Sequence, residues 1–233
     1  PTGRLCPDFG TGGSVNVEPE VLNAQPPAVK GEVKFAGPPA VVNDVIALGT
    51  TVRDFHRANA PNGAVRAFDA RTGARRWTFD PVPRTAADPA YAGWTPEAAQ
   101  NTGAGNVWGL MSTDEARDLL FLPTSGPSPD FFGGTRPGDN RYSDSIVALR
   151  GSTGEVVWYF QTVHHDVWDY DNSAQPTLVE LTRDGQPFPA VTQGTKTTAF
   201  APKAYTFTGT LASITATSEV LAVYWKGGSD DAV

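Results

Sequence analysis

The sequence predicts an all-β protein built from repeated strand–turn–strand units. Three observations favour this fold class. The 233 residues include 24 glycines and 20 prolines, short apolar runs alternate with turn residues, and one strand–turn–strand unit occurs twice. Glycine and proline favour turns and interrupt helices, so a chain rich in both is expected to form short strands joined by many turns.

Composition narrows the classes of function. The net charge is −7 and the isoelectric point is near 4.9, so no nucleic-acid partner is expected. No apolar run is long enough to cross a bilayer and no signal peptide opens the chain, so we expect no membrane segment here. Cys6 is the single cysteine and has no partner for an internal disulfide. The length suits one large or two small domains.

Strands are predicted wherever short apolar runs lie between turn signals. Residues 1–35 carry turn signals and little periodicity. Two short strands are expected within residues 40–49, with Asn43 and Asp44 as the tight turn between them. Further strands are predicted over residues 64–79, 107–111, 118–123, 146–160, 176–181 and 189–193. The loops 80–107 and 124–143 are long for a β domain, which indicates a functional or covering role.

One unit repeats along the chain, because residues 64–79 and 146–160 match position by position. Gly73 and Gly154 are 81 residues apart, and so are Trp77 and Trp158. Such repeats indicate a β-propeller or a similar radial array. The glycine is expected to take a positive φ in the turn, and the tryptophan to pack against a neighbouring blade. Two unrelated hairpins in a sandwich are the alternative, which the identical tryptophan offset disfavours.

The densest chemical signal is residues 161–171, QTVHHDVWDYD, directly after a predicted strand. A loop this rich in titratable and aromatic groups at a strand end is typical of a functional site, and a hydrogen-bonded polar corner is the less favoured alternative. His164, His165 and Asp166 suggest a zinc cluster, but adjacent residues of an extended chain point to opposite faces. We therefore expect these three residues to orient the turn at Trp168 and Asp169.

Several segments together resemble a known family. Residues 67–77 resemble the tryptophan-docking motif of the quinoprotein alcohol dehydrogenase superfamily, and residues 146–158 resemble a second copy with Arg150 where aspartate is expected. Three further segments resemble the membrane-bound glucose, quinate and polyol dehydrogenases of that superfamily, namely residues 38–46, 136–142 and 159–169. The resemblance extends from residue 1 to about 196.

The resemblance implies a fold and an activity. It implies about three blades of an eight-bladed propeller, with pyrroloquinoline quinone (PQQ) near its axis and Ca²⁺ or Mg²⁺ on the quinone. It also implies oxidation of a sugar or polyol hydroxyl on the periplasmic side of the bacterial inner membrane, with ubiquinone as electron acceptor. Residues 1–196 form the expected propeller segment. Residues 197–233 form a divergent tail, either a genuine end or out-of-frame translation, and the segment alone is expected to be inactive.

The resemblance also implies roles for single residues. Asp169 matches the catalytic base and a ligand of PQQ, and Lys196 matches the lysine that contacts the quinone oxygens. Trp108 matches the tryptophan beneath the PQQ ring. A turn-capping aspartate, a solvated lysine and a core tryptophan are the respective structural alternatives.

The metal assignment has less support from the residues. Asp54 matches a carboxylate proposed to hold the metal, but Phe55 stands where these enzymes usually have asparagine, so a possible oxygen ligand is lost. His56 is read as a surface residue. Gly126 stands where related methanol dehydrogenases have a metal-binding asparagine. The alternative is a protein of another functional class, a non-enzymatic propeller scaffold that shares the docking repeat. Such a scaffold has no reason to carry Trp108, Asp169 and Lys196 together.

Overall fold

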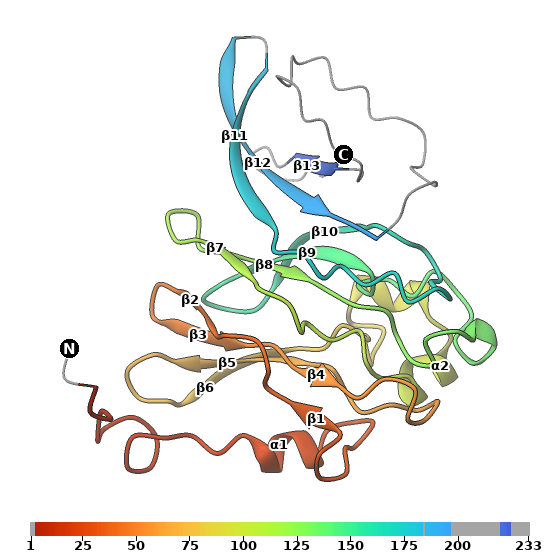
Figure 1. The fold of residues 1–233 in the computed structure, drawn as a ribbon, viewed down its shortest axis with the longest axis horizontal. Coiled ribbons are helices and arrows are strands. Elements are labelled where there is room, and N and C mark those ends of the chain that lie inside the picture. The colour runs from red at the N-terminus through yellow and green to blue at the C-terminus, as the bar shows by residue number, and fades with distance from the viewer. Residues whose placement is uncertain (1–2, 184, 197–219, 225–233) are drawn as a thin grey trace.

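The structure is a computed structural model that describes residues 3–183, 185–196 and 220–224. Three antiparallel sheets lie one above another in it (Figure 1). The first contains β2 (Ala40–Val42), β3 (Val45–Leu48), β5 (Val65–Asp69) and β6 (Arg75–Phe79). The second contains β7 (Ser112–Asp114), β8 (Leu119–Pro123), β9 (Ser145–Arg150) and β10 (Val156–Gln161). The third contains β11 (Thr177–Arg183), β12 (Gln186–Gly194) and β13 (Val220–Tyr224).

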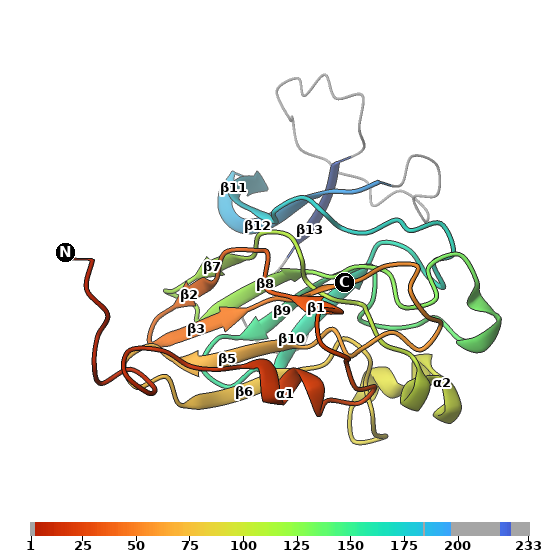
Figure 2. The same cartoon turned by 60° about the horizontal axis from the view of Figure 1, so that its bottom comes forward.

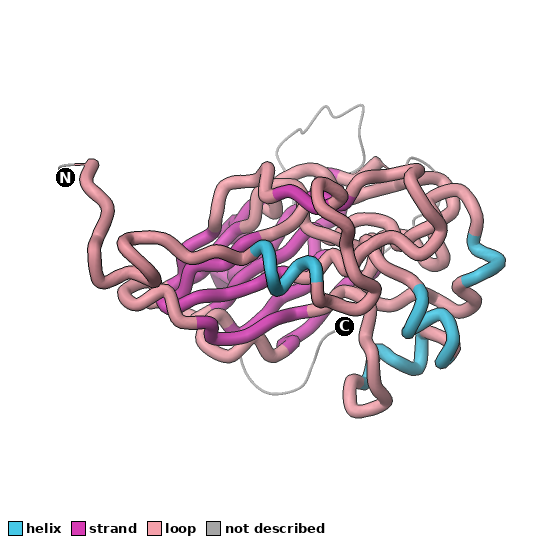
Figure 3. Tube along the Cα trace, turned by 90° about the horizontal axis from the view of Figure 1, so that it is seen from below, coloured by secondary structure: helices cyan, strands magenta, loops and turns pink. Residues whose placement is uncertain are grey.

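The remaining elements are short and lie outside the stack. Strands β1 (Val33–Lys34) and β4 (Thr51–Val52) pair as a small separate ribbon. Helix α1 (Glu18–Leu22) crosses the outer face of the first sheet (Figures 2 and 3). The 3₁₀ helices η1 (Pro89–Gly93) and η2 (Gly133–Thr135) and helix α2 (Pro96–Asn101) belong to the two long loops. None of the helices in the described part of the chain combines the length and apolarity that a membrane crossing requires.

The first two sheets are copies of one four-stranded blade, which confirms the prediction of a partial β-propeller. Their strands follow the same meander and the same register. Ala67 pairs with Trp77 in one sheet, and Ala148 pairs with Trp158 in the other. Gly73 and Gly154 both have positive φ, at 71° and 77°. Because only glycine takes this conformation without steric cost, the repeated glycine fixes the same turn in both blades.

Trp77 joins the first blade to the second, as the sequence predicts. Its indole Nε1–H donates to the carbonyl oxygen of Gly151 at 2.8 Å, in the turn that follows β9. Its ring lies so close to Gly154 that a Cβ atom there would be 2.6 Å from the indole. The contact buries a large aromatic side chain and satisfies its only donor, as a buried tryptophan requires.

The second turn departs from the first at one position, and a neighbouring residue compensates. In the first copy Asp69 accepts hydrogen bonds from the backbone N–H of Thr72 at 2.8 Å and from its hydroxyl at 2.9 Å. Arg150 replaces this aspartate in the second copy. There the carboxylate of Asp118 accepts from the N–H and hydroxyl of Ser152, at 3.2 and 2.6 Å. A side chain from the preceding hairpin therefore holds the turn closed.

Two apolar layers separate the three sheets. Val45, Val65, Leu122 and Val147 belong to the larger layer, between the first and second sheets. A smaller layer lies on the other face of the second sheet. In it Trp158 packs beside Phe121, and Val191 of β12 belongs to the same cluster. The core is therefore a stack of half-buried sheets, which is how antiparallel blades bury both faces.

The segment before β7 differs from its prediction. The hairpin predicted over residues 107–123 forms, but β7 begins at Ser112, so the prediction of a strand over residues 107–111 is wrong. This segment passes between loops, and the Trp108 indole bonds to a side chain outside the sheets. The predicted divergent tail, residues 197–233, lies outside the described residues except for β13, which pairs with β12.

A glycine exchange tests the docking contact. Gly154→Ala and Gly185→Ala both place alanine at a positive φ, of 77° and 75°, but only Gly154 has a neighbour within 4 Å, the Trp77 ring. We expect Gly154→Ala to lower the free energy of unfolding by about 2 kcal/mol more than Gly185→Ala, because overpacking adds to the backbone strain. Urea denaturation measures both; equal losses would contradict a close tryptophan contact.

Candidate cofactor and substrate site

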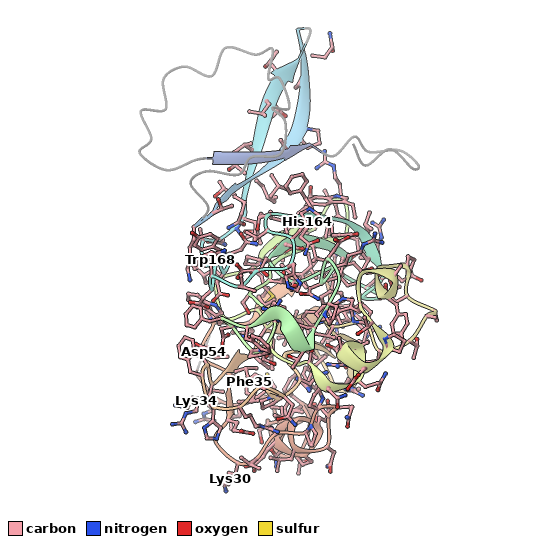
Figure 4. All side chains as sticks on the ribbon, turned by 90° about the vertical axis from the view of Figure 1, so that its right-hand side faces the viewer. Lys30, Lys34, Phe35, Asp54, His164 and Trp168 are labelled. Atoms are coloured by element: carbon pink, nitrogen blue, oxygen red, sulfur yellow. The ribbon has the colours of Figure 1, made fainter. Side chains whose placement is uncertain are left out.

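Three loops meet at one end of the stacked sheets, on the right of Figure 1. They are residues 53–57 after β4, residues 124–136 after β8 and residues 162–172 after β10. All of the residues predicted for the site except Trp108 and Lys196 lie in these loops. Figure 4 views this end and places Asp54 and Trp168 on the same side of the molecule.

The turn at residues 166–171 is held by the buried side chain of Asp166. Its carboxylate accepts from the backbone N–H of Trp168 at 3.0 Å and of Tyr170 at 2.8 Å. The guanidinium of Arg136 donates a hydrogen bond to the backbone carbonyl oxygen of Asp166. Asp169, between the two donors, takes a left-handed conformation with φ of 60°. The orienting role expected of residues 164–166 is thus visible in Asp166.

The two histidines differ in their surroundings. His165 places Nδ1 2.9 Å from the carbonyl oxygen of Gly138, and its ring packs against Gly133. His164 is exposed. Since the two rings have separate environments, the pair does not form a common chelating face.

Asp169 and Lys196, which are 27 residues apart in sequence, are in contact. The Lys196 ammonium donates to the Asp169 carbonyl oxygen at 2.9 Å and lies 3.7 Å from its carboxylate. Burial and then the neighbouring charge of Asp171 raise the pKa of Asp169, and Lys196 opposes this shift. The pair therefore provides a proton acceptor beside a fixed positive charge.

Trp108 is tied to this turn through Asp171, a residue for which the sequence suggested no role. The Trp108 indole N–H donates to one carboxylate oxygen at 2.9 Å, and the Gly126 N–H donates to the other at 2.8 Å. The indole is 37 % exposed, so its orientation is fixed while part of its ring remains open. The Asp-Tyr-Asp spacing of residues 169–171 is the only sequence signal that could have indicated Asp171.

Asp54 belongs to the same electrostatic environment. Partial burial of its carboxylate and the charges of Asp130, Asp171 and Asp169 together raise its pKa to about 6, while Lys196 opposes the shift. The loop that carries Asp54 is anchored by Glu32, which is buried and receives two hydrogen bonds of 2.9 Å from Arg57.

The anchoring carboxylate of Glu32 is ionised in its buried position. Burial alone would raise the pKa of Glu32, but the bonds from Arg57 and from the Val29 N–H hold it below its usual value. His56 lies 3.5 Å from the same carboxylate, so its side chain belongs to this anchor.

A second buried carboxylate lies beneath the site and was also missed by sequence reasoning. Asp144 is fully buried, and neither of its carboxylate oxygens has a hydrogen-bond partner within the described part of the chain. Burial and the charges of Asp166 and Asp171 raise its pKa well above the usual value, while Arg136 opposes the shift. Nothing in its local sequence marks it, since it precedes an ordinary apolar strand.

The residues fit the two expected ligands unequally. For PQQ, Trp108 offers an oriented aromatic surface, and Lys196 offers a cation next to Asp169. For a divalent cation, the oxygen donor of Asp54 is suitable. However, across residues 3–183, 185–196 and 220–224 no three His, Cys, Asp or Glu side chains are arranged to hold a metal ion. Phe55 adds no oxygen ligand. The described residues thus fit PQQ better than they fit the cation.

The fold is that of stacked propeller blades, with the candidate site in the loops at one end of them. Residues 1–201 match the family model described as PQQ: glucose/ethanol/alcohol dehydrogenase, β-propeller domain. The chain belongs to this family.

Curated relatives agree with the family match. The chain is 38 % identical over 198 residues to the glycerol dehydrogenase large subunit of Gluconobacter oxydans. This alignment covers 84 % of the chain and 25 % of the relative. It is 38 % identical over 201 residues to the quinate/shikimate dehydrogenase (quinone) of Acinetobacter baylyi, covering 85 % and 24 %. It is 36 % identical over 196 residues to the quinoprotein glucose dehydrogenase of Escherichia coli, covering 84 % and 24 %. The chain spans about a quarter of the length of these relatives.

Solved structures show the same fold. The quinohemoprotein alcohol dehydrogenase from Comamonas testosteroni superimposes with a TM-score of 0.63 at 27 % identity, covering 75 % of the chain and 27 % of that protein. A europium-containing methanol dehydrogenase superimposes with a TM-score of 0.60 at 28 % identity, covering 70 % and 30 %.

The raised pKa of Asp54 predicts a pH-dependent contribution to stability. The pKa of Asp54 rises from 3.8 to about 6 on folding. Its stabilising contribution is therefore fully present below pH 3.8 and is lost as the pH rises through the folded-state pKa of about 6. We therefore expect the free energy of unfolding to fall more steeply between about pH 4 and pH 7 in the wild type than in Asp54→Asn.

Urea denaturation across this pH range measures the difference between the two proteins. Added salt should shrink it, because Asp54 is exposed and its neighbours' charges are screened. Parallel pH profiles at low salt would contradict the clustering of carboxylates around Asp54.

Proposed function

We propose that this chain is a segment of a quinoprotein dehydrogenase that oxidises a sugar or polyol hydroxyl with PQQ and passes the electrons to ubiquinone. The observation that carries the proposal is the joint placement of Asp169, Lys196 and Trp108 around one turn. The family membership of the chain supports it, as do relatives named as glycerol, quinate/shikimate and glucose dehydrogenases.

Asp169 acts as the general base in this proposal. When bound, PQQ supplies the acceptor for the hydride that leaves the carbinol carbon. The Asp169 carboxylate takes the hydroxyl proton, and a base with a raised pKa binds that proton more firmly than an ordinary aspartate would. The hydrogen bonds from Trp168 and Tyr170 to Asp166 keep the turn, and with it the base, in one position.

Lys196 and Trp108 hold and polarise the cofactor. The Lys196 ammonium, 3.7 Å from the Asp169 carboxylate, stabilises negative charge that develops next to the base. Trp108 provides a flat surface for a flat ring system, with its indole N–H already satisfied by Asp171. This ring therefore needs little reordering when a ligand stacks on it.

A divalent cation, Ca²⁺ or Mg²⁺, belongs to the proposal with Asp54 as its ligand from this chain. Its charge would lower the pKa of Asp54 and relieve the repulsion among the surrounding carboxylates. Location at the periplasmic side of the inner membrane is likewise proposed, on the family resemblance alone. A non-enzymatic scaffold is the competing function, and PQQ binding discriminates between the two.

Binding of PQQ is the direct test. Trp108→Ala should weaken PQQ binding about tenfold, because the loss of an aromatic stacking surface costs about 1 to 1.5 kcal/mol. Trp94→Phe is the control, since Trp94 is buried in a separate apolar cluster with Val82 and Ala98. Equilibrium dialysis followed by PQQ absorbance measures both without relying on tryptophan fluorescence. Absence of saturable binding to the wild type would favour the scaffold.

Turnover by the chain alone is expected to be absent. The three described blade-like sheets do not close a ring around the site, and the aligned part of the chain covers only 25 % of the glycerol dehydrogenase relative, so other cofactor contacts are expected from further blades. The measurement is glucose-dependent reduction of an artificial electron acceptor, with PQQ and Ca²⁺ or Mg²⁺ present. If the wild-type chain is active and the Asp169→Asn variant is not, the prediction is wrong and these sheets suffice for catalysis.

A further inference from the structure

Large exposed aromatic side chains gather on the loops around Asp54 and Asp169. Phe55, Phe131 and Trp168 are 68 %, 62 % and 66 % exposed. They come from the three different loops that form the site. Aromatic groups of this size are usually buried, and their concentration at one place indicates a binding surface.

Phe55 keeps its position at a conformational cost. Its φ is 54°, in the left-handed region where asparagine and glycine are tolerated and a bulky aromatic residue is rare. Strain of this kind persists where the surroundings enforce it, and it is a reason to look for function. Two contacts enforce it here. The Phe55 ring stacks on Phe131, with centroids 5.3 Å apart and planes 7° apart, and its N–H points at the Asp130 carboxylate at 3.5 Å.

Carboxylates flank the stacked pair. Asp54 precedes Phe55 and Asp130 precedes Phe131, and the charges of Asp130 and Asp169 both act on Asp54. An aromatic surface flanked by hydrogen-bond acceptors suits a small polar molecule that also has an apolar face. Carboxylates accept bonds from hydroxyl groups, while the rings cover an apolar face of the same molecule.

We propose that the Phe55–Phe131 pair forms an aromatic wall of the substrate site and packs against the C–H face of a cyclic sugar or cyclic polyol. The inference rests on the proposed dehydrogenase function and adds to it the substrate class. A short linear polyol such as glycerol has no ring face for the wall to cover. Phe55 and Phe131 thereby act as specificity residues, favouring rings over linear chains.

The experiment measures contact with two probes, D-glucose and glycerol, by saturation-transfer NMR on the chain in the presence of PQQ. Phe55→Asn and Phe131→Ala should each weaken glucose binding about threefold to tenfold, the range expected for one aromatic contact. Glycerol binding should stay unchanged. Val41→Asn is the control, an exposed apolar residue on β2 given the same polar side chain.

A stability measurement separates specificity from structure. Asparagine tolerates a left-handed backbone, so Phe55→Asn should not lower the transition temperature while it weakens glucose binding. A fall in transition temperature with unchanged glucose contact would assign Phe55 a structural role and overturn the inference. Glucose contact that is absent in the wild type, or equal in wild type and Phe55→Asn, would overturn it as well.

PQQ dialysis on the same preparations keeps the two proposals distinguishable. Phe55→Asn should bind PQQ as the wild type does. If the wild type fails to bind PQQ but glucose contact still depends on Phe55, the dehydrogenase proposal fails and the aromatic wall stands. If the wild type binds PQQ but glucose contact does not depend on Phe55, the aromatic-wall proposal fails and the dehydrogenase proposal stands.

Discussion

The contact between Trp77 and the turn of the following blade determines how the rest of the structure is assembled. A four-stranded antiparallel sheet has two faces to bury and cannot do so alone. The Trp77 indole reaches across to Gly151 and packs over Gly154, so the spacing between the two sheets is set by one side chain and one tight turn. The apolar layer between the sheets then closes around a separation that is already fixed.

This stacking brings the ends of the strands together, and the site is built there from loops. The loops do not rely on regular backbone pairing for their shape; buried or half-buried carboxylates hold them. Asp166 closes the turn at residues 166–171, Asp171 links Trp108 to Gly126, and Glu32 anchors the loop of Asp54 through Arg57. The same chemistry that makes the site acidic thus also gives it its geometry. Removing one of these carboxylates would alter position and charge together.

Sequence reasoning recovers the repeated units and the strands that carry a clear hydrophobic pattern. The 81-residue repeat predicts both blades, the glycine turns and the packing of Trp77 on the next blade. The contact between Asp169 and Lys196 also agrees with the arrangement that the family resemblance implies. Interactions that depend on the meeting of distant loops were not predictable. Asp118 replaces the missing partner at Arg150 from another hairpin, and no local pattern announces such a compensation.

The two failures at the site have different causes. Residues 107–111 have a strand-like apolar pattern, yet the segment serves to carry Trp108 to Asp171, and that tertiary hydrogen bond overrides the local propensity. Asp144 is invisible for the opposite reason, since a single charged residue before a strand usually lies in solvent and here lies buried. Both residues lie where the loops converge, so local sequence is least informative there.

Backbone strain follows the same division of the molecule. Among the described residues, nine other than glycine have positive φ. Asn43 and Asp118 lie in tight turns between strands, where such a conformation is ordinary. The other seven lie in the segments that meet at the site end of the sheets: Phe55, Ala104, Asn140, Tyr142, Asp144, His165 and Asp169. Regular sheets stacked by tryptophan docking supply the stability that lets these segments hold costly conformations, because strained residues persist only where their surroundings over-determine them. The blades are therefore the support, and most departures from the preferences of the backbone lie in the irregular segments outside them.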